Sequence, residues 1–192
     1  GQADMRRAYH SATQTTAPGF YYRESDAGTK AVLDAWRAGT LLTYYAGHSH
    51  FWGWAFPQLF HADHIEELGP SPLTLLLSMT CFTGVFYHPT APSLDEALLS
   101  APDRGTITSL SPMSMGSAAG HRRMQGDIIR TLLAGGSIGE AMLAGKLTLG
   151  SAYRDLVDTY GVLGDPALGF ASAPTDSTPN QTMLPLVANG VG

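Results

Sequence analysis

Two residues able to act as nucleophile and base each follow an apolar run that has the character of a buried strand. His48 comes just after residues 40–46, TLLTYYA, and Cys81 comes just after residues 73–79, LTLLLSM. Ligands of open parallel sheets bind beyond the carboxyl ends of the strands. An imidazole beside a thiol can take or share its proton, and the thiolate then attacks a carbonyl carbon. If the two strands are neighbours, the pattern predicts a His48–Cys81 pair for nucleophilic catalysis.

Cys81 also has a purely structural interpretation. It is the only cysteine of the 192 residues, so no intrachain disulfide can form. A lone cysteine is most often a small buried hydrophobe. Cysteine counting alone therefore leaves both interpretations open.

The other histidines near the first motif offer a metal-based alternative. His48, His50, His61, Asp63 and His64 have the residue types of a zinc hydrolase, in which imidazoles and a carboxylate hold the metal that acidifies a water. An aromatic stretch, FWGWAFPQLF, separates the two halves of this set, which weakens the pattern. The segment HADHIEEL resembles a surface helix and accounts for its histidines without a metal.

The elements that must position these residues alternate between helix and strand. Serines at capping-box spacing begin two of the helices, Ser93 with Glu96 and Ser137 with Glu140. Continuous apolar strands between amphipathic helices are typical of a largely parallel sheet covered on both faces, so the fold class is α/β. The predicted helices span 26–37, 93–99, 120–134 and 137–149, and the predicted strands span 40–46, 73–79 and 105–110.

Charge and hydropathy exclude two classes of partner. The formal charge is −5 and no Lys/Arg-rich block is present, which argues against nucleic-acid binding. No apolar run approaches the roughly 20 residues of a membrane helix, and residues 1–10 lack the apolar core of a signal peptide. We therefore expect no membrane span and no nucleic-acid partner.

Three motifs in order carry a family resemblance. They are AGTLLTYYAGHS at 38–49, followed by a tryptophan a few residues on, LLLSMTCFTGVF at 75–86 and DTYGVLGDPAL at 158–168. Together they resemble the gingipain-like cysteine peptidases, family C25 of the caspase-related clan. The resemblance extends from about residue 21 to residue 170, which is most of the chain.

The resemblance implies a fold and an activity. The fold would be a caspase-like three-layer sandwich with a mostly parallel sheet, of which this chain supplies roughly the C-terminal half. The activity would be that of a cysteine endopeptidase working through a His–Cys dyad and a thioester acyl-enzyme. A sortase-like transpeptidase on the same fold and a catalytically silent binding module remain as alternatives.

The resemblance also assigns roles to residues. His48 corresponds to the catalytic histidine and Cys81 to the nucleophile, while main-chain N–H groups of Gly47, Ser49 and Cys81 are expected at the oxyanion. The family usually has glycine where this chain has Ser49. The residues expected to contact substrate are Trp52, Trp54, Thr80, Met113 and Met115.

The expected site also needs acidic groups. Asp95 and Glu96 are the nearest acidic candidates for a basic substrate side chain, although the capping box already explains Glu96. No residue corresponds to the carboxylate that orients the histidine in related enzymes. We expect that group from upstream polypeptide, either the N-terminal half of the same precursor or another chain that completes the sheet.

The ends of the chain complete the expected organisation. Residues 1–16 are expected to be a leading arm or the edge of an upstream portion, and 17–171 a C25-like catalytic subdomain. Residues 172–192 begin as a Ser/Thr/Pro-rich linker and are expected to end as a sorting-like tail. This favours an extracellular or bacterial cell-surface location and a polypeptide substrate. The resemblance requires no cofactor for catalysis and allows structural calcium.

Overall fold

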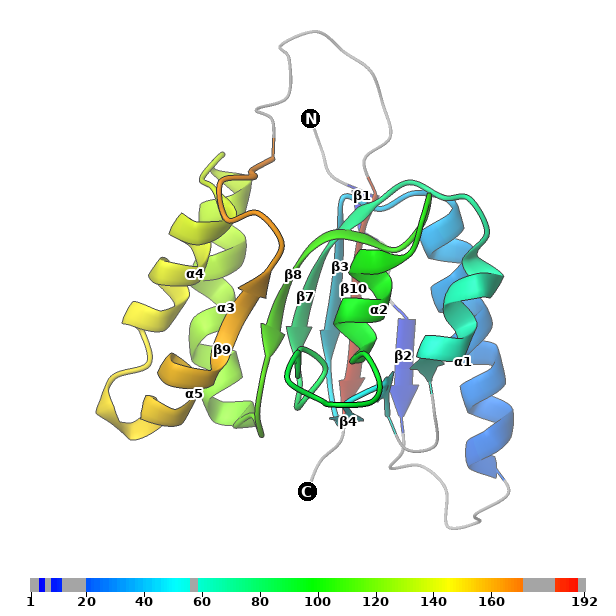
Figure 1. Cartoon of the computed structure of the whole chain (residues 1–192), viewed down its shortest axis with the longest axis horizontal. Coiled ribbons are helices and arrows are strands. Elements are labelled where there is room, and N and C mark those ends of the chain that lie inside the picture. Colours follow the sequence, from blue (N-terminus) through cyan, green and yellow to red (C-terminus); the bar gives the residue numbers. More distant parts are fainter. Residues whose placement is uncertain (1–3, 6–7, 12–19, 56–58, 171–181, 190–192) are drawn as a thin grey trace, which may run out of the picture.

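The chain folds around one mostly parallel β-sheet with helices on both faces (Figure 1). The computed structural model describes residues 4–5, 8–11, 20–55, 59–170 and 182–189, with side chains over 27–55 and 59–170. The main sheet has seven strands in the order β1-β10-β3-β7-β8-β9, and β2 also pairs with β10. Its strands are β1 (Asp4–Met5), β2 (Ala8–Ser11), β3 (Leu42–Ala46), β7 (Thr74–Met79), β8 (Thr106–Pro112), β9 (Tyr160–Leu163) and β10 (Thr182–Asn189).

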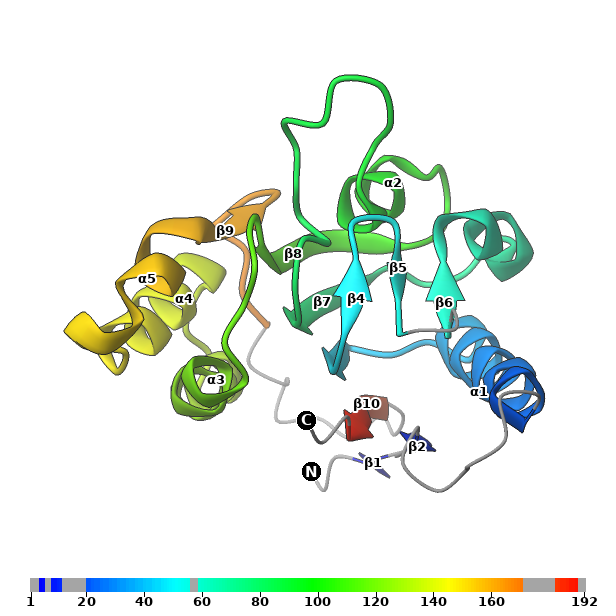
Figure 2. The same ribbon diagram turned by 90° about the horizontal axis from the view of Figure 1, so that it is seen from below.

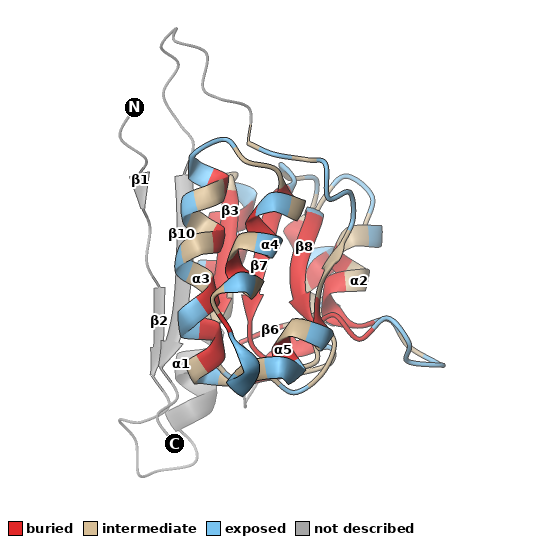
Figure 3. Ribbon diagram, turned by 90° about the vertical axis from the view of Figure 1, so that its left-hand side faces the viewer, coloured by how far each residue is buried: buried red, intermediate tan, exposed pale blue. Residues whose placement is uncertain are grey.

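Two groups of helices cover the opposite faces of this sheet. Figure 3 shows the buried strands β3, β7 and β8 behind the helices of one layer. One layer contains α3 (Ala118–Leu133), α4 (Ile138–Leu147), η2 (Ser151–Tyr153) and α5 (Arg154–Thr159). The other contains α1 (Phe20–Arg37), η1 (Ala62–Leu68) and α2 (Leu94–Ser100). The prediction of an α/β three-layer sandwich with a mostly parallel sheet is confirmed.

Side chains alternate along each central strand between two apolar cores. In β3, Leu42 and Tyr44 pack with α3 and α4, whereas Tyr45 packs with α1 and η1. In β7, Leu75 belongs to the first core and Leu76 to the second. Because both faces are covered, these strands carry apolar side chains on both faces, with single buried polar residues such as Thr43 and Ser78 among them.

Serine caps begin α2 and α4 as the sequence predicts. Ser93 accepts a hydrogen bond from the N–H of Glu96, and the Glu96 carboxylate accepts one from the N–H of Ser93. Ser137 and Glu140 form the same reciprocal pair at α4. Both capping boxes satisfy main-chain donors that the first helical turn leaves without partners.

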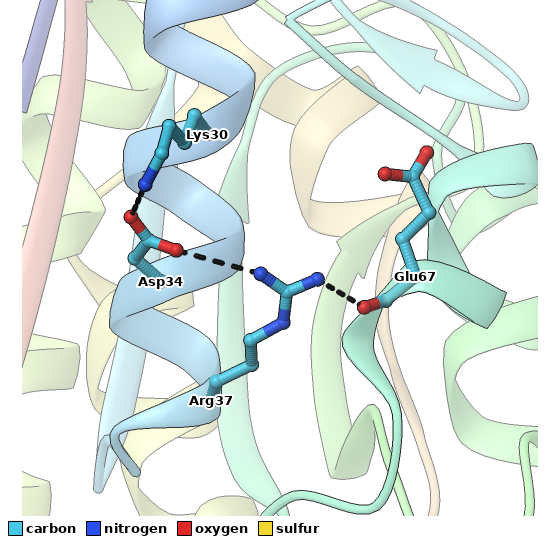
Figure 4. Close-up of polar contacts among 4 residues, drawn as sticks. All are labelled: Lys30, Asp34, Arg37 and Glu67. Atoms are coloured by element: carbon cyan, nitrogen blue, oxygen red, sulfur yellow. Dashed lines mark hydrogen bonds and ion pairs between the residues drawn. The ribbon is translucent and has the colours of Figure 1, made fainter.

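Helix α1 is longer than its apolar periodicity indicates and is tied to η1. The sequence predicts a helix over 26–37, and α1 begins six residues earlier at Phe20. Near its end, Asp34 pairs with Lys30 and with Arg37, and Arg37 also donates to the main-chain oxygen of Glu67 in η1 (Figure 4). The bond from Arg37 to Glu67 is the one that joins α1 to η1, the next helical element of the same layer.

The C-terminal segment is part of the main sheet, which differs from the linker and tail expected for residues 172–192. Instead of belonging to a separate tail, β10 lies parallel to β3, with Met183 opposite Leu42 and Val187 opposite Ala46. An uncovered β3 would leave a row of main-chain donors and acceptors unpaired, and the apolar C-terminal run satisfies them. Pro185, opposite Tyr44, lacks an N–H and removes one donor from this ladder.

The N-terminal segment also enters the sheet rather than remaining a leading arm. β1 and β2 both pair in parallel with β10 on the side away from β3. Both neighbours of β3 therefore come from this chain. A strand from another polypeptide is not needed at that position.

Besides β1, β2 and β10, the sequence analysis missed a small second sheet and the last strand before the C-terminal segment. The aromatic stretch after His48 forms a small antiparallel sheet of β4 (Ser49–His50), β5 (Gly53–Trp54) and β6 (Phe60–His61). Strand β9 adds antiparallel to β8. These strands have two to four residues, which is too short to show a period.

Candidate active site

His48 and Cys81 lie at matching positions beyond two neighbouring strands. β3 and β7 are adjacent and parallel, and Ala46 is paired with Met79 at their carboxyl ends. His48 is two residues beyond Ala46, and Cys81 is two residues beyond Met79. Neighbouring strands are about 4.8 Å apart, so both residues leave the sheet at one edge. The condition attached to the predicted pair, that the two strands be neighbours, is met.

Both side chains are open to solvent to some extent. His48 is exposed and Cys81 is intermediate in exposure. The main-chain oxygen of His48 accepts two hydrogen bonds, from the N–H of Ala55 at 2.7 Å and from the hydroxyl of Tyr45. The backbone at His48 is thus fixed while its imidazole faces outward.

A serine and a threonine join the two strand ends. Ser49 Oγ accepts a hydrogen bond from the N–H of Cys81 at 3.0 Å and donates to the main-chain oxygen of Cys81. It also contacts Thr80 Oγ1 at 2.6 Å, and that hydroxyl reaches the main-chain oxygen of Gly47 at 2.7 Å. The segment after β3 and the segment after β7 are therefore linked by side-chain hydroxyls.

The sulfur of Cys81 faces a second loop, which follows β8. The N–H of Gly116 donates to Cys81 Sγ at 3.3 Å. A Cβ on Gly116 would lie 2.4 Å from the main-chain oxygen of Thr80 and 2.2 Å from the His121 ring, so only glycine fits. A main-chain donor aimed at the sulfur stabilises negative charge there.

The main-chain donors expected at the oxyanion are used differently. The N–H of Cys81 donates to Ser49 Oγ at 3.0 Å, and the N–H of Gly47 donates to the main-chain oxygen of Met79 at 3.4 Å. The prediction that these two groups face an oxyanion is wrong for this conformation. For Cys81 the physical reason is the Ser49 hydroxyl, which supplies an acceptor that glycine would not, and for Gly47 it is the main-chain oxygen at the end of β7.

Two of the expected substrate contacts are buried instead. Trp54 has no exposed surface, and its ring stacks on Tyr45 with centroids 4.5 Å apart and on Trp36 at 6.2 Å. Thr80 is 1% exposed and bonds to the strand ends as described. Both predictions of substrate contact are corrected, because one side chain fills the core and the other joins the two loops.

The remaining expected contacts lie on the outer side of the site. Trp52 is 40% exposed and Met115 is 65% exposed. Met113 is intermediate, and its main-chain oxygen accepts a hydrogen bond from Tyr87. Tyr87 belongs to the loop after Cys81, which projects beyond the sheet and α2 in Figure 2. Apolar side chains are thus available on both sides of the His48–Cys81 edge.

The histidines of the zinc hypothesis are not assembled for metal binding. His61 Nδ1 accepts from the N–H of Asp63 at 3.3 Å, and His64 Nδ1 accepts from the N–H of His61 at 2.9 Å, which together form a capping box for η1. Across the described ranges, no three His, Cys, Asp or Glu side chains are placed to share an ion. Burial lowers the pKa of both His50 and His61, and the charge of His61 lowers that of His50 further.

A buried carboxylate lies beneath the loop that carries Cys81. Asp95 is fully buried in α2, and its Oδ2 accepts hydrogen bonds from the hydroxyls of Ser78, Thr83, Ser109 and Ser111. Burial raises the pKa of this carboxyl to about 6, against the lowering effect of the four hydroxyls. Asp95 is consequently unable to reach a basic substrate side chain, and Glu96 is occupied by its capping box.

A buried histidine packs behind Gly116. His121 is 5% exposed, and its ring lies edge-on to Tyr160 with centroids 5.8 Å apart. Burial lowers its pKa to about 4. Its Nε2 finds no hydrogen-bond partner among the residues with described side chains. The neutral imidazole acts here as a packing group under the glycine that faces the sulfur.

Comparison with known proteins decides the family. The sequence profile of peptidase family C25 matches residues 2–171. The chain belongs to peptidase family C25. The match includes His48, Cys81 and the whole of the sheet edge that they share, whereas β10 lies beyond it. Comparison of the C25 chain with curated proteins gave no match.

Solved structures of longer proteins show the same fold. A complex of the Porphyromonas gingivalis RgpB pro- and mature domains superposes with a TM-score of 0.66 at 24% identity, covering 73% of this chain and 36% of that one. The Arg-specific cysteine proteinase gingipain R (RgpB) gives 0.63 at 22% identity, with coverages of 73% and 36%. A structure described only as a protease gives 0.61 at 15% identity, covering 77% and 41%. This C25 chain spans about a third of the length of the two RgpB structures.

Several contacts at the C25 site and in the buried layer beneath it were not found by sequence reasoning. Serines inside otherwise apolar strands were the available signal for the Asp95 cluster, because Ser109 and Ser111 share one face of β8 by period two. The contacts of Ser49 and Gly116 had no comparable signal. They depend on three loops meeting at one edge of the sheet.

Proposed function

We propose that this C25 chain carries the catalytic pair of a cysteine endopeptidase, with Cys81 as nucleophile and His48 as acid–base group. The observation that supports it is the matching position of His48 and Cys81 beyond two adjacent parallel strands. The carboxyl ends of parallel strands are where α/β folds bind their ligands. The solvent-open edge gives a polypeptide access to both side chains.

The proposed reaction has two steps. The Cys81 thiolate attacks the scissile carbonyl carbon, the C–N bond breaks, and the amine leaves with a proton supplied by the His48 imidazolium. Water then attacks the thioester, which releases the carboxylic acid product and returns the thiol. The Gly116 N–H stabilises negative charge at the sulfur before the first step.

The proposed substrate is a polypeptide with an apolar side chain beside the scissile bond. Trp52 and Met115 are exposed on the two sides of the site, and Met113 lies between Tyr87 and Gly161. Asp95, the nearest acidic candidate on the chain, is enclosed by hydroxyls. These observations favour apolar over basic side chains at that position.

The proposal places the histidine-orienting carboxylate on polypeptide outside this chain. The chain spans about a third of the length of the RgpB structures that share its fold.

An extracellular or cell-surface location belongs to the same proposal. None of the helices in the described ranges has the length and apolar character that a membrane span requires.

The test compares thiol modification with peptide cleavage in the protein that contains this chain. Iodoacetamide should abolish cleavage of a mixed peptide library in proportion to the carbamidomethylation of Cys81, measured by peptide mass mapping. Cys81→Ala should be inactive and His48→Ala strongly impaired. Full cleavage by Cys81→Ala would overturn the proposal.

A further inference from the structure

The Ser49 hydroxyl makes an unusual set of contacts with its neighbour across the strands. It accepts from the N–H of Cys81 at 3.0 Å, donates to the main-chain oxygen of Cys81, and lies 2.6 Å from Thr80 Oγ1. Ser49 is 7% exposed and Thr80 is 1% exposed. One buried side chain thus holds both main-chain polar atoms of the residue that bears the thiol.

One of these hydrogen bonds does not depend on where the hydroxyl protons of Ser49 and Thr80 point. The hydroxyls of Ser49 and Thr80 have one proton each, but three oxygen–oxygen contacts need a proton: Ser49 with Cys81, Thr80 with Gly47, and Ser49 with Thr80. Two protons cannot fill three contacts at once, so the hydroxyls share them. The bond from the N–H of Cys81 to Ser49 Oγ uses neither proton and persists in every arrangement.

The chain is strained immediately after Cys81. Phe82 has φ +60°, a left-handed conformation that a residue with a side chain rarely adopts. Its N–H donates to the main-chain oxygen of Ser114 at 3.0 Å. Strain of this kind persists only where surrounding contacts impose it. Ser49 holds the residue before the strained position, and Ser114 holds the strained residue itself.

We propose that Ser49 is a positioning residue for the Cys81 thiol, acting through both main-chain polar atoms of Cys81. It holds the end of β7 against the strained turn, so that the sulfur stays opposite the Gly116 N–H and level with His48. Because the N–H of Cys81 is committed to Ser49 Oγ, the main-chain donor that faces the sulfur comes from Gly116. This inference rests on the proposed function, in which Cys81 is the nucleophile.

The central test removes the hydroxyl and then restores it. In the protein that contains this chain, Ser49→Ala should lower kcat by about 10- to 100-fold with little change in KM, because the sulfur is displaced rather than the substrate site. It should also slow carbamidomethylation of Cys81 and alter the pH profile of that reaction. Ser49→Thr, which keeps the hydroxyl, should recover most of kcat and the original profile.

A matched control separates positioning from general loss of a buried hydroxyl. Ser78→Ala removes a fully buried serine hydroxyl from β7, the strand that leads to Cys81, where it bonds to Asp95 rather than to Cys81. We expect it to lower the melting temperature while leaving kcat and the alkylation profile unchanged. Equal effects of Ser49→Ala and Ser78→Ala on kcat and alkylation would contradict a positioning role.

Two variants distinguish a wrong role for Ser49 from a wrong choice of Cys81 as the nucleophile. If Cys81→Ala is inactive and Ser49→Ala keeps the wild-type kcat, only the role of Ser49 is wrong. If Cys81→Ala cleaves peptides, the nucleophile itself is wrong. Should Ser49→Ala not fold, Ser49→Thr decides, because a fall in kcat of more than about 10-fold in that folded variant would overturn the proposal.

Discussion

His48 and Cys81 stand level at one edge of the sheet, each two residues beyond the paired strand positions Ala46 and Met79. The relationship explains how a five-residue strand and a six-residue strand place a histidine and a cysteine at the same edge of the sheet. Because the His48 side chain is exposed, it is not part of the packed core that stabilises the fold.

His48→Ala should therefore impair catalysis without destabilising the protein. We expect kcat to fall by about 10²- to 10⁴-fold, the range for loss of a general acid–base group. The melting temperature should stay within about 2 °C of wild type, since exposed substitutions change stability little. Steady-state kinetics and thermal unfolding measured on the same sample test this. A large fall in melting temperature would show that His48 has a packing role.

The two tryptophans after His48 should respond in opposite ways. Trp54→Ala removes a buried ring stacked on Tyr45 and should lower the free energy of unfolding by about 3–5 kcal/mol. Trp52→Ala removes a 40% exposed ring and should raise KM with a much smaller change in stability. Urea unfolding and peptide kinetics on both variants provide the measurement. A stable Trp54→Ala with altered KM would reverse this assignment.

Asp95 should make the protein more stable as the pH falls toward 4. Its pKa is about 6 in the folded state and 3.8 when solvated, so between these values the folded state holds more protons than the unfolded state. The stabilisation is fully present below pH 3.8 and is lost as pH rises through 6, a difference of about 3 kcal/mol. Asp95→Asn removes this contribution, so its stability relative to wild type should fall by that amount between pH 7 and pH 4. Urea unfolding from pH 4 to pH 7 measures it.

His121 should make the protein less stable as the pH falls, over a pH range similar to that of Asp95. Its pKa is 6.5 when solvated and about 4 in the folded state, so its stabilisation is present above pH 6.5 and lost as pH falls to 4. The expected size is again about 3 kcal/mol. His121→Gln should therefore gain stability on acidification, while Asp95→Asn should lose it. Identical pH curves for these two variants would contradict the opposed contributions.

Removal of the C-terminal segment should expose one edge of β3. A chain ending at Ala171 lacks β10, so the paired positions Leu42 to Ala46 lose a neighbour. We expect a lower melting temperature and self-association, because an uncovered central strand offers unpaired hydrogen-bonding groups to other chains. Size-exclusion chromatography and thermal unfolding of the two lengths test this. A monodisperse truncated chain with unchanged melting temperature would show that β10 does not stabilise the sheet.

Local sequence signals were enough to identify the elements that carry the site. Apolar runs before His48 and Cys81 predicted β3 and β7 to within two residues, and the serine caps of α2 and α4 are in place. These features depend on contacts between residues close in sequence, namely strand hydrophobicity and capping geometry. The ordered motifs identified the family for the same reason, because each is a short continuous stretch.

The contacts between segments far apart in the sequence were revealed by the folded structure. Sequence alone could not show that the Ser49 hydroxyl would take the N–H of Cys81, that Trp54 would be enclosed in the core, or that β10 would pair with β3. A hydrogen bond or a buried surface depends on which groups share the same space, and the spacing of residues along the chain does not contain that information. The residue pattern along the chain was enough to name His48 and Cys81 as candidates and to predict the strands before them, and the packing of three loops at one edge determined which groups hold Cys81.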